Sequence, residues 1–178
     1  MIDTPRLRLR RARIDDAEDM FRVFGDPRAM RYWDSLPHAE VGQTRAWLER
    51  MVALPAGASD DFILEHQGRA IGKAGCWRIA EIGFILHPDH WGRGLASEAL
   101  GAIIPHVFET LPVDRLEADV DPRNVASLRL LGKFGFREVG RAERNVQVGE
   151  EWYDSVYLAL PRPAALDGAA GAAERQAS

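Results

Sequence analysis

Glycines that follow a strongly apolar segment are the first residues in this sequence whose type and spacing could do chemistry. Residues 81–86 read EIGFIL, and after a short turn the chain continues Gly92-Arg93-Gly94-Leu95-Ala96 into a helical stretch. Glycine lets a backbone approach an anion closely, and the free N–H groups and positive dipole end of a helix bind phosphate. This segment therefore indicates a phosphate-binding loop at the start of a helix.

Two common nucleotide-binding motifs do not fit this loop. The dinucleotide pattern G-x-G-x-x-G needs a third glycine where Ser97 stands, and no acidic residue ends a following strand at the right distance. A Walker A loop needs G-K-[ST], which the sequence lacks. Both nucleotide-binding interpretations are therefore rejected.

The elements that must position this loop begin with a strand and two helices. Apolar residues alternate in 5–12, which predicts a half-buried strand, and recur at helical spacing in 14–24 and in 39–54. Residues 28–38 show no period and are expected to form a loop. Three strands follow at 62–65, 70–77 and 81–86, joined by short turns, and they are expected to form an antiparallel meander.

The second half of the chain alternates helices with strands. A helix is expected at about 93–110, and Pro105 should kink or shorten it. A strand at 115–120 and a helix at 124–134, closed by Gly135, come next. The last strands are 136–140, with a possible extension through Val148, and 152–160. This order predicts a mixed α+β sheet rather than a doubly wound one.

Composition restricts the class of protein. The 178 residues include 23 Lys+Arg and 27 Asp+Glu, and the net charge of −4 disfavours a general nucleic-acid binder. No apolar run reaches the roughly 18 residues of a membrane span, and the first residues lack the apolar core of a secretory signal. Cys76 is the single cysteine and the five His lack metal-binding spacing, so no metal site is expected. We expect a cytoplasmic protein.

The chain is expected to hold one domain over residues 1–160. Residues 161–178 are rich in Ala, Gly and Pro and carry no large apolar face after Leu166. Such a segment cannot bury enough apolar surface to fold. A disordered C-terminal tail is therefore expected over 161–178.

Four motifs in order resemble the GNAT N-acetyltransferase superfamily, and in particular its RimJ/RimL-like branch, the ribosomal-protein type of N-terminal acetyltransferase. The segment Trp91-Gly92-Arg93-Gly94-Leu95-Ala96 is similar to the acyl-CoA loop Q/R-x-x-G-x-G/A, with the branch's Trp in first position. Residues 124–136 (NVASLRLLGKFGF) match N-x-x-S-x-x-L-x-x-K-x-G-F. Residues 4–10 and 151–154 are similar to the branch's first and last strands, so the resemblance covers about residues 3–160.

The resemblance implies a GNAT fold, with a mixed, mostly antiparallel sheet of about seven strands and four main helices. The parallel neighbours 81–86 and 115–120 should splay to admit acetyl-CoA. The strand backbone at Ile85, Leu86 and His87 would pair with the pantetheine arm. Asn124 would lie near the thioester, and the pyrophosphate would be held by Gly92, Arg93, Gly94, Leu95, Ala96 and Ser97.

The resemblance also assigns the catalytic roles. Glu81 is the expected base that deprotonates the acceptor ammonium, directly or through water, and a backbone N–H in 85–87 could stabilise the oxyanion. Many members place a tyrosine seven residues after the asparagine to protonate the thiolate, and here that residue is Leu131. Ser127 is the candidate substitute, with solvent as the alternative. The plainer readings are a salt-bridged Glu81, a helix N-cap at Asn124 and a local hydrogen bond from Ser127.

The implied reaction is direct acetyl transfer from acetyl-CoA to a primary amine in a ternary complex, without a metal. The branch favours a protein N-terminal α-amine; a polyamine, aminoglycoside or amino-acid derivative uses the same scaffold, and a non-catalytic acetyl-CoA sensor is a further alternative. Tyr32, Trp33 and Trp152 could line the acceptor pocket. Carboxylates gathered there would favour a polyamine or an aminoglycoside, but the sequence does not place Asp34, Asp60 and Asp61 together. The protein could be a monomer or a homodimer.

Overall fold

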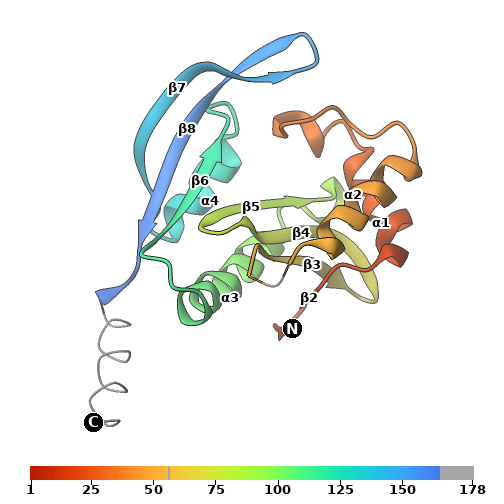
Figure 1. The fold of residues 1–178 in the computed structure, drawn as a ribbon, viewed down its shortest axis with the longest axis horizontal. Helices are drawn as coiled ribbons and strands as arrows, with labels where there is room; N and C mark the ends of the chain where they lie inside the picture. The colour runs from red at the N-terminus through yellow and green to blue at the C-terminus, as the bar shows by residue number, and fades with distance from the viewer. Residues whose placement is uncertain (56, 165–178) are drawn as a thin grey trace.

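The chain folds around one mixed sheet of eight strands in the computed structural model, which describes residues 1–55 and 57–164 (Figure 1). The spatial order is β1-β2-β3-β4-β5-β6-β8-β7, and every neighbouring pair is antiparallel except β5 and β6. The strands are β1 (Ile2–Asp3), β2 (Arg8–Arg10), β3 (Asp60–His66), β4 (Arg69–Arg78), β5 (Glu81–Leu86), β6 (Arg115–Val120), β7 (Arg137–Val148) and β8 (Glu151–Pro161).

Helices cover both faces of the sheet. They are α1 (Ala17–Phe24), α2 (Val41–Ala53), α3 (Leu95–Thr110) and α4 (Val125–Lys133), with short 3₁₀ turns η1 (Ile14–Asp16), η2 (Met30–Tyr32) and η3 (Pro88–His90). Phe62 and Leu64 of β3 belong to the core formed with α3, whereas Ile63 between them belongs to the core formed with α1 and α2. Alternate strand residues point to opposite faces, so a continuous apolar run serves a sheet covered on both sides.

A buried ion cluster ties the first strand to the rest. The guanidinium of Arg10 donates to Asp16 Oδ1 at 2.6 Å and Oδ2 at 2.9 Å, and to Glu65 Oε2 at 2.6 Å. The Arg10 and Asp16 side chains are each 8% exposed, so removing one partner would leave a buried charge uncompensated. The cluster fixes β2 against β3 and holds η1, which leads into α1.

The parallel pair β5–β6 is joined at one end only. Glu81 and Glu117 are its single register pair among the described residues, and Glu117 N donates to Ala80 O at 2.7 Å. Beyond this point the two strands diverge (Figure 1). The predicted splay of these two strands is therefore confirmed.

Most predicted elements are confirmed, and the differences have physical reasons. The sheet has eight strands rather than about seven because Ile2 and Asp3 pair with Leu9 and Arg8. The sequence predicts that Pro105 kinks or shortens its helix, and the shortening is wrong: α3 runs through Pro105 to Thr110. The prediction of a disordered tail falls largely on 165–178, which lie outside the described residues, while residues up to Pro161 belong to β8.

Burial explains why α3 continues past Pro105. Proline removes one helical hydrogen bond, but the residues on either side of it are packed in the core. Ile103 and Val107 are fully buried, and Ile104 and Phe108 are 7% and 2% exposed. The apolar area that these side chains bury outweighs one lost backbone hydrogen bond.

Candidate active site

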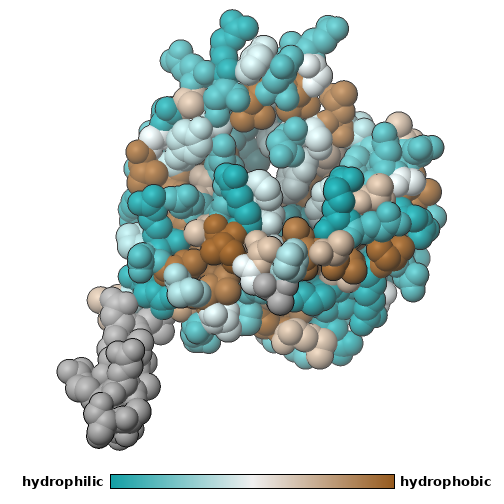
Figure 2. All heavy atoms as spheres, in the orientation of Figure 1, coloured by the Kyte–Doolittle hydropathy of each residue, from teal (hydrophilic) through white to brown (hydrophobic). Residues whose placement is uncertain are grey.

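A cavity of about 370 Å³ opens between the two halves of the sheet. Its walls come from the segment between α1 and α2, from β4, β5 and β6, from the first turn of α4, and from the β7–β8 hairpin. The molecular surface is hollowed between the hairpin and the α1–α2 side (Figure 2). The lining includes Tyr32, Trp33, Asp34, Trp47, Lys73, Trp77, Glu81, Asp119, Asp121, Asn124, Ser127, Leu131, Tyr153, Asp154 and Ser155.

The fold brings Glu81, Asn124 and Ser127 to this one cavity. Glu81 begins β5, and the other two residues open α4, which directly follows the neighbouring strand β6. The single parallel bridge between β5 and β6 lies beside Glu81, so the gap that opens past it is flanked by all three. Residues distant in the sequence thus meet where the parallel strands separate.

Asn124 caps α4 with one end of its amide. Its Oδ1 accepts a hydrogen bond from Ser127 N at 3.1 Å, which satisfies one free donor of the helix start. The amide NH₂ remains available to the cavity. Within residues 1–55 and 57–164 the Ser127 hydroxyl has no protein hydrogen-bond partner, so the local hydrogen bond considered for it is made by its backbone instead.

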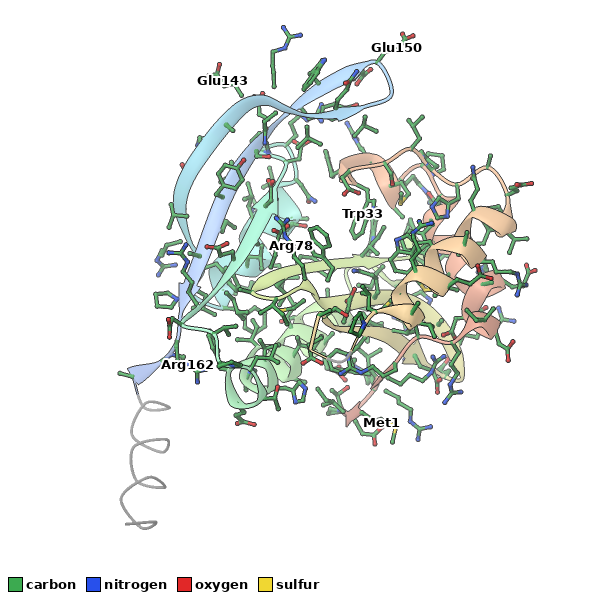
Figure 3. The ribbon with its side chains drawn as sticks, viewed as in Figure 1. Met1, Trp33, Arg78, Glu143, Glu150 and Arg162 are labelled. Atoms are coloured by element: carbon green, nitrogen blue, oxygen red, sulfur yellow. The ribbon has the colours of Figure 1, made fainter. Side chains whose placement is uncertain are left out.

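Glu81 is held by two neighbours from the end of β4. Trp77 Nε1 donates to Oε1 at 3.0 Å, and Arg78 donates to Oε2 from Nε at 2.8 Å and from Nη2 at 2.5 Å. The Arg78 guanidinium also lies 4.6 Å from the Trp77 ring centre. Arg78 lies between the two halves of the sheet (Figure 3). Glu81 therefore forms the salt bridge considered for it and also lines the cavity.

Four further carboxylates line the cavity, from Asp34, Asp119, Asp121 and Asp154. Burial raises the pKa of Asp121, but its hydrogen bonds from Arg123 outweigh that effect and leave the pKa lowered. Asp119 behaves in the opposite way: partial burial of its carboxylate is the largest influence and raises its pKa. Asp60 and Asp61 do not belong to the cavity lining.

An arginine bridges the two sides of the cavity. The Arg123 guanidinium lies 5.9 Å from the ring centre of Tyr32 and 4.4 Å from that of Tyr153. It also donates to Asp121 from Nε at 2.9 Å and from Nη2 at 2.5 Å. Cation–π contacts of this kind join the α1–α2 segment to the β7–β8 hairpin beside Asn124.

Indole rings and one buried lysine form the cavity wall on the α1–α2 side. Lys73 Nζ lies 5.8 Å from the Trp33 ring centre and 5.7 Å from that of Trp47, and it pairs with Asp61. The Lys73 and Asp61 side chains are 3% and 4% exposed, so this cation is neutralised within the protein. Trp33 points into the central gap (Figure 3). The cavity therefore combines an aromatic wall with a carboxylate-rich one.

The glycine loop lies at the start of α3. Gly94 is the N-cap residue of α3 with φ +75°, and Gly92 has φ +69°, a region that favours glycine. Arg6 fixes the loop by donating to Arg93 O at 2.8 Å and to Glu98 Oε2 at 2.6 Å. The predicted loop residues Leu95, Ala96 and Ser97 form the first turn of α3, whose free N–H groups suit an anion.

The end of β5 leads from the gap to this loop. His87 N donates to Ile71 O of β4 at 2.9 Å, so its N–H belongs to the sheet. The backbone N–H and C=O groups of successive strand residues point alternately to the two neighbouring strands. Those of Ile85 and His87 therefore point to β4, and those of Leu86 point to the side of β6. The Trp91 indole donates to Leu86 O at 2.9 Å and holds the loop against the strand.

Sequence reasoning identified part of the cavity and missed the rest. Tyr32 and Trp33 line it as anticipated, but Trp152 does not, and Tyr153 takes that place. The alternation of β8 could have separated these two neighbours, because only one of them can share a face with Ser155. Asp119 carries a similar signal, since it lies between the buried residues Ala118 and Val120.

Other reactive side chains do not form a second centre in the described residues. The rings of His66, His87 and His90 lie near one another, yet no group of three or more His, Cys, Asp or Glu in that part of the chain is placed to hold a metal ion. Cys76 is buried, and burial raises the pKa of its thiol to about 12, which argues against an acyl-carrying thiolate. Residues 1–55 and 57–164 contain no helix with the length and apolarity to cross a bilayer.

Several curated relatives of this chain are named N-acetyltransferases. Its residues 6–137 match the acetyltransferase (GNAT) domain family. The chain is 34% identical over 146 residues to the uncharacterized N-acetyltransferase p20 of Bacillus licheniformis. The matched region covers 77% of this chain and 82% of that protein. It is 32% identical over 89 residues to the [ribosomal protein uS5]-alanine N-acetyltransferase of Escherichia coli, over 50% of this chain and 46% of that protein.

Solved structures share the fold. RimL, a ribosomal L7/L12 α-N-protein acetyltransferase solved with coenzyme A, superposes with a TM-score of 0.80 at 18% identity, over 89% of this chain and 95% of that one. A spermidine N-acetyltransferase from Vibrio cholerae, solved with CoA and spermine, gives 0.76 at 19% identity, over 89% and 97%. Since the family match also spans most of the chain, the protein belongs to the GNAT acetyltransferase family and is an acyltransferase with acetyl-CoA as its acyl donor.

Proposed function

We propose that this protein transfers the acetyl group of acetyl-CoA directly to a primary amine bound in the cavity, with a protein N-terminal α-amine as the acceptor. The observation that carries the proposal is the meeting of Glu81, Asn124 and Ser127 in one cavity where β5 and β6 separate. The glycine loop and the start of α3 lie at the far end of the same strand β5. One elongated substrate can therefore reach from the phosphate-binding loop to the cavity.

The residues present fit acetyl-CoA as a substrate. Gly92 and Gly94 adopt positive φ and carry no side chain, so an anion can come close to the backbone at the N-terminus of α3. This loop suits a pyrophosphate held by Gly92, Arg93, Gly94, Leu95, Ala96 and Ser97. The pantetheine arm would follow Ile85, Leu86 and His87, with the Leu86 N–H on the open side. The free amide NH₂ of Asn124 would face the thioester end.

The chemistry needs a neutral amine, a stabilised oxyanion and a proton for the leaving thiolate. Carboxylates on the cavity wall, Glu81 among them, orient the ammonium and take its proton, directly or through water. The Leu86 N–H lies on the open side of β5, where it can stabilise the oxyanion. Ser127 supplies the thiolate proton, since Leu131 stands where many relatives carry tyrosine. Because no described residue forms a hydrogen bond with the Ser127 hydroxyl, this hydroxyl is free to turn toward the sulfur.

A small polycationic amine is the second candidate acceptor. The cavity carries the carboxylates of Asp34, Glu81, Asp119, Asp121 and Asp154, and its one lining lysine among the described residues is already neutralised. Aromatic faces next to carboxylates suit an extended ammonium compound. This carboxylate lining supports a polyamine or an aminoglycoside independently of the named relatives.

Free-thiol release from acetyl-CoA tests the proposal. The acceptors are peptides with N-terminal alanine or serine, spermidine and an aminoglycoside, and calorimetric titration with acetyl-CoA measures binding separately. Turnover of the peptides supports the N-terminal acceptor, and turnover of spermidine or the aminoglycoside supports the second candidate. Tight binding without turnover on any of them supports the acetyl-CoA sensor, and absence of binding contradicts the assignment of the loop.

Substitution of Glu81 tests the catalytic part. Glu81→Gln should keep acetyl-CoA binding and lower turnover at least tenfold. The control is Glu49→Gln, because Glu49 is an exposed residue of α2 outside the cavity. Unchanged turnover in Glu81→Gln removes this carboxylate from the mechanism.

A further inference from the structure

Asp119 is a cavity carboxylate that no motif assigns. Glu81 and Glu117 are register partners on parallel strands, and Asp119 follows two residues after Glu117 on β6. Residues two apart on a strand share a face, so Asp119 lies on the same face of the sheet as Glu81, one strand away. Its neighbours Ala118 and Val120 point into the core instead. Asp119 therefore faces the cavity together with Glu81.

Two neighbours hold the Glu81 carboxylate in place at the cavity wall. Both of its oxygens accept hydrogen bonds, from Trp77 and from Arg78. Glu81 is thus suited to attract and orient an ammonium ion.

The surroundings of Asp119 differ because it has no arginine or lysine ion-pair partner among the described residues. The Ser155 hydroxyl on β8 is the neighbouring polar group that favours its ionised form. Although Asp119 is exposed as a residue, its carboxylate loses hydration against the cavity wall, and this is the main cause that raises its pKa. Ser155 lowers this pKa by a smaller amount.

The charged groups that face Asp119 come from every neighbouring element. Glu81 on β5 and Asp34 between α1 and α2 raise its pKa further, and Arg78 on β4 lowers it. On β6 itself, Glu117 and Asp121 are paired with Arg115 and Arg123. Tyr157 is the register partner of Asp119 on β8. Glu81, Glu117 and Asp121 each have an arginine partner, and Asp34 has no ion-pair partner among the described residues. Glu81 and Asp34 therefore add to the effect of burial, which favours the protonated form of Asp119.

We propose that Asp119 accepts the proton that the acceptor amine loses, while Glu81 holds the ammonium in position beside it. The ammonium gives one proton to the Asp119 carboxylate and becomes a neutral amine. The amine attacks the thioester carbonyl, a C–N bond forms and the C–S bond breaks. The attacking nitrogen loses a second proton, and the thiolate gains one. Asp119 releases the first proton to solvent, so one amide, one thiol and one proton result. This inference rests on the proposed function.

The pH dependence of kcat/KM tests it with the peptide or spermidine that the wild-type protein acetylates. In the wild-type protein kcat/KM should rise with pH as Asp119 ionises. Asp119→Asn should lower kcat/KM at pH 7 at least tenfold and abolish that rise, with acetyl-CoA binding retained. Glu117→Gln is the matched control on the same strand and face, and it should follow the wild-type profile. A wild-type profile in Asp119→Asn overturns the inference.

Neighbouring variants separate a proton acceptor from a residue with a merely structural role. Ser155→Ala removes a hydroxyl that lowers the pKa of Asp119, so the rise in kcat/KM should move to higher pH. Glu81→Gln removes a like charge, so the rise should move to lower pH even though turnover falls. If the rise disappears in Glu81→Gln and persists unshifted in Ser155→Ala, Glu81 alone is the base and the inference fails.

A titration without turnover keeps this test separate from the proposed function. Carbon NMR of the Asp119 carboxyl in the full chain, with Asp119→Asn for assignment, should show a pKa above the ordinary aspartate value that Ser155→Ala raises further. An ordinary pKa overturns the inference even when acetyl transfer is observed. If no acceptor is acetylated, the proposed function fails and the inference fails with it, whereas an ordinary pKa in an active enzyme overturns the inference alone.

Discussion

The side chain of Asn124 has two polar ends, and the fold uses only one of them. Its Oδ1 caps α4 through the Ser127 N–H, and its NH₂ group faces the cavity. A helix cap and a substrate contact can therefore coexist in one residue. At the residue scale this separation makes the two functions independently measurable.

Substitutions at Asn124 should divide stability from binding. Asn124→Ala loses the cap and should lower the free energy of unfolding by about 0.5–2 kcal/mol, with weaker acetyl-CoA binding. Asn124→Asp keeps the cap oxygen and places a favourable charge at the helix start, so it should retain stability while acetyl-CoA binding weakens. Denaturant unfolding and calorimetry measure the two effects. Equal acetyl-CoA affinity in Asn124→Asp and the wild-type protein would show that Asn124 only caps the helix.

Ser127→Ala should act on the reaction alone. The Ser127 backbone N–H, not the hydroxyl, donates the capping hydrogen bond to Asn124 Oδ1. We therefore expect an unchanged melting temperature and unchanged acetyl-CoA affinity. The maximal rate should fall several-fold, since solvent can replace a serine hydroxyl as a proton source. Single-turnover thiol release with the best acceptor measures this loss. A lowered melting temperature with an unchanged rate would assign Ser127 to the fold.

At the scale of elements, the start of α3 is shaped by backbone conformation more than by side chains. Gly94 holds φ +75° at the N-cap, and Arg6 reaches across from the first strand region to bond Arg93 O and Glu98. The phosphate-binding geometry therefore depends on one left-handed residue and on a strap from a distant part of the chain. Burial raises the pKa of Glu98 in the first turn of α3, but hydrogen bonds from Thr4 and Arg6 outweigh this effect and leave the pKa lowered. These contacts therefore stabilise the ionised carboxylate.

Gly94→Ala should weaken both the fold and acetyl-CoA binding. An L-residue in the left-handed region costs about 1–2 kcal/mol, so unfolding should require correspondingly less denaturant. Relaxation of the loop away from φ +75° should weaken acetyl-CoA binding as well. Gly132→Ala is the matched control, because Gly132 lies inside α4 with no atom within 4 Å of an added Cβ, and alanine there favours the helix. Acetyl-CoA affinity that is equal in the two variants would contradict a role for the Gly94 backbone.

At the scale of the whole molecule, a single backbone register pair joins the β6-β8-β7 half to the other strands among the described residues, although one apolar core contains residues of both halves. This parallel bridge connects β5 to β6, and Arg162 after β8 makes another connection near the same end of β6 (Figure 3). Its guanidinium donates to Val113 O at 3.0 Å, Phe108 O at 2.6 Å and Leu111 O at 2.8 Å. These bonds satisfy carbonyls at the C-terminal end of α3 that no helical N–H reaches.

Removal of Arg162 should therefore loosen the whole fold. Arg162→Ala should lower the free energy of unfolding by about 2 kcal/mol, because charged hydrogen bonds are lost and partly buried carbonyls stay unpaired. Arg115→Ala removes an exposed ion pair and should change it by less than about 1 kcal/mol. We propose that the domain ends here: a chain stopped after Ala164 should melt like the full chain, and one stopped after Leu160 should melt earlier. Equal melting of both shortened chains would contradict this boundary.

Local patterns in the sequence gave much of the fold because each element carries its own signal. Alternation at 5–12, apolar segments bounded by turns at 62–65 and 70–77, helical spacing at 14–24 and 39–54, and the stop at Gly135 all correspond to observed elements. The two-residue strand β1 could not be found this way, since two residues show no period and pair only because β2 lies beside them. The continuation of α3 through Pro105 was missed because burial, which offsets the lost hydrogen bond, depends on tertiary contacts.

The sequence by itself determined the glycine loop, the polar start of α4 and the family that they indicate, because these depend on neighbouring residues. Only the tertiary structure decided which side chains share the cavity. It paired Glu81 with Arg78, brought Asp34, Asp119 and Asp154 to one cavity and left Asp60 and Asp61 outside its lining. The physical reason is that charge, burial and proton affinity depend on distances across the sheet, and strand pairing sets those distances between residues far apart in the chain.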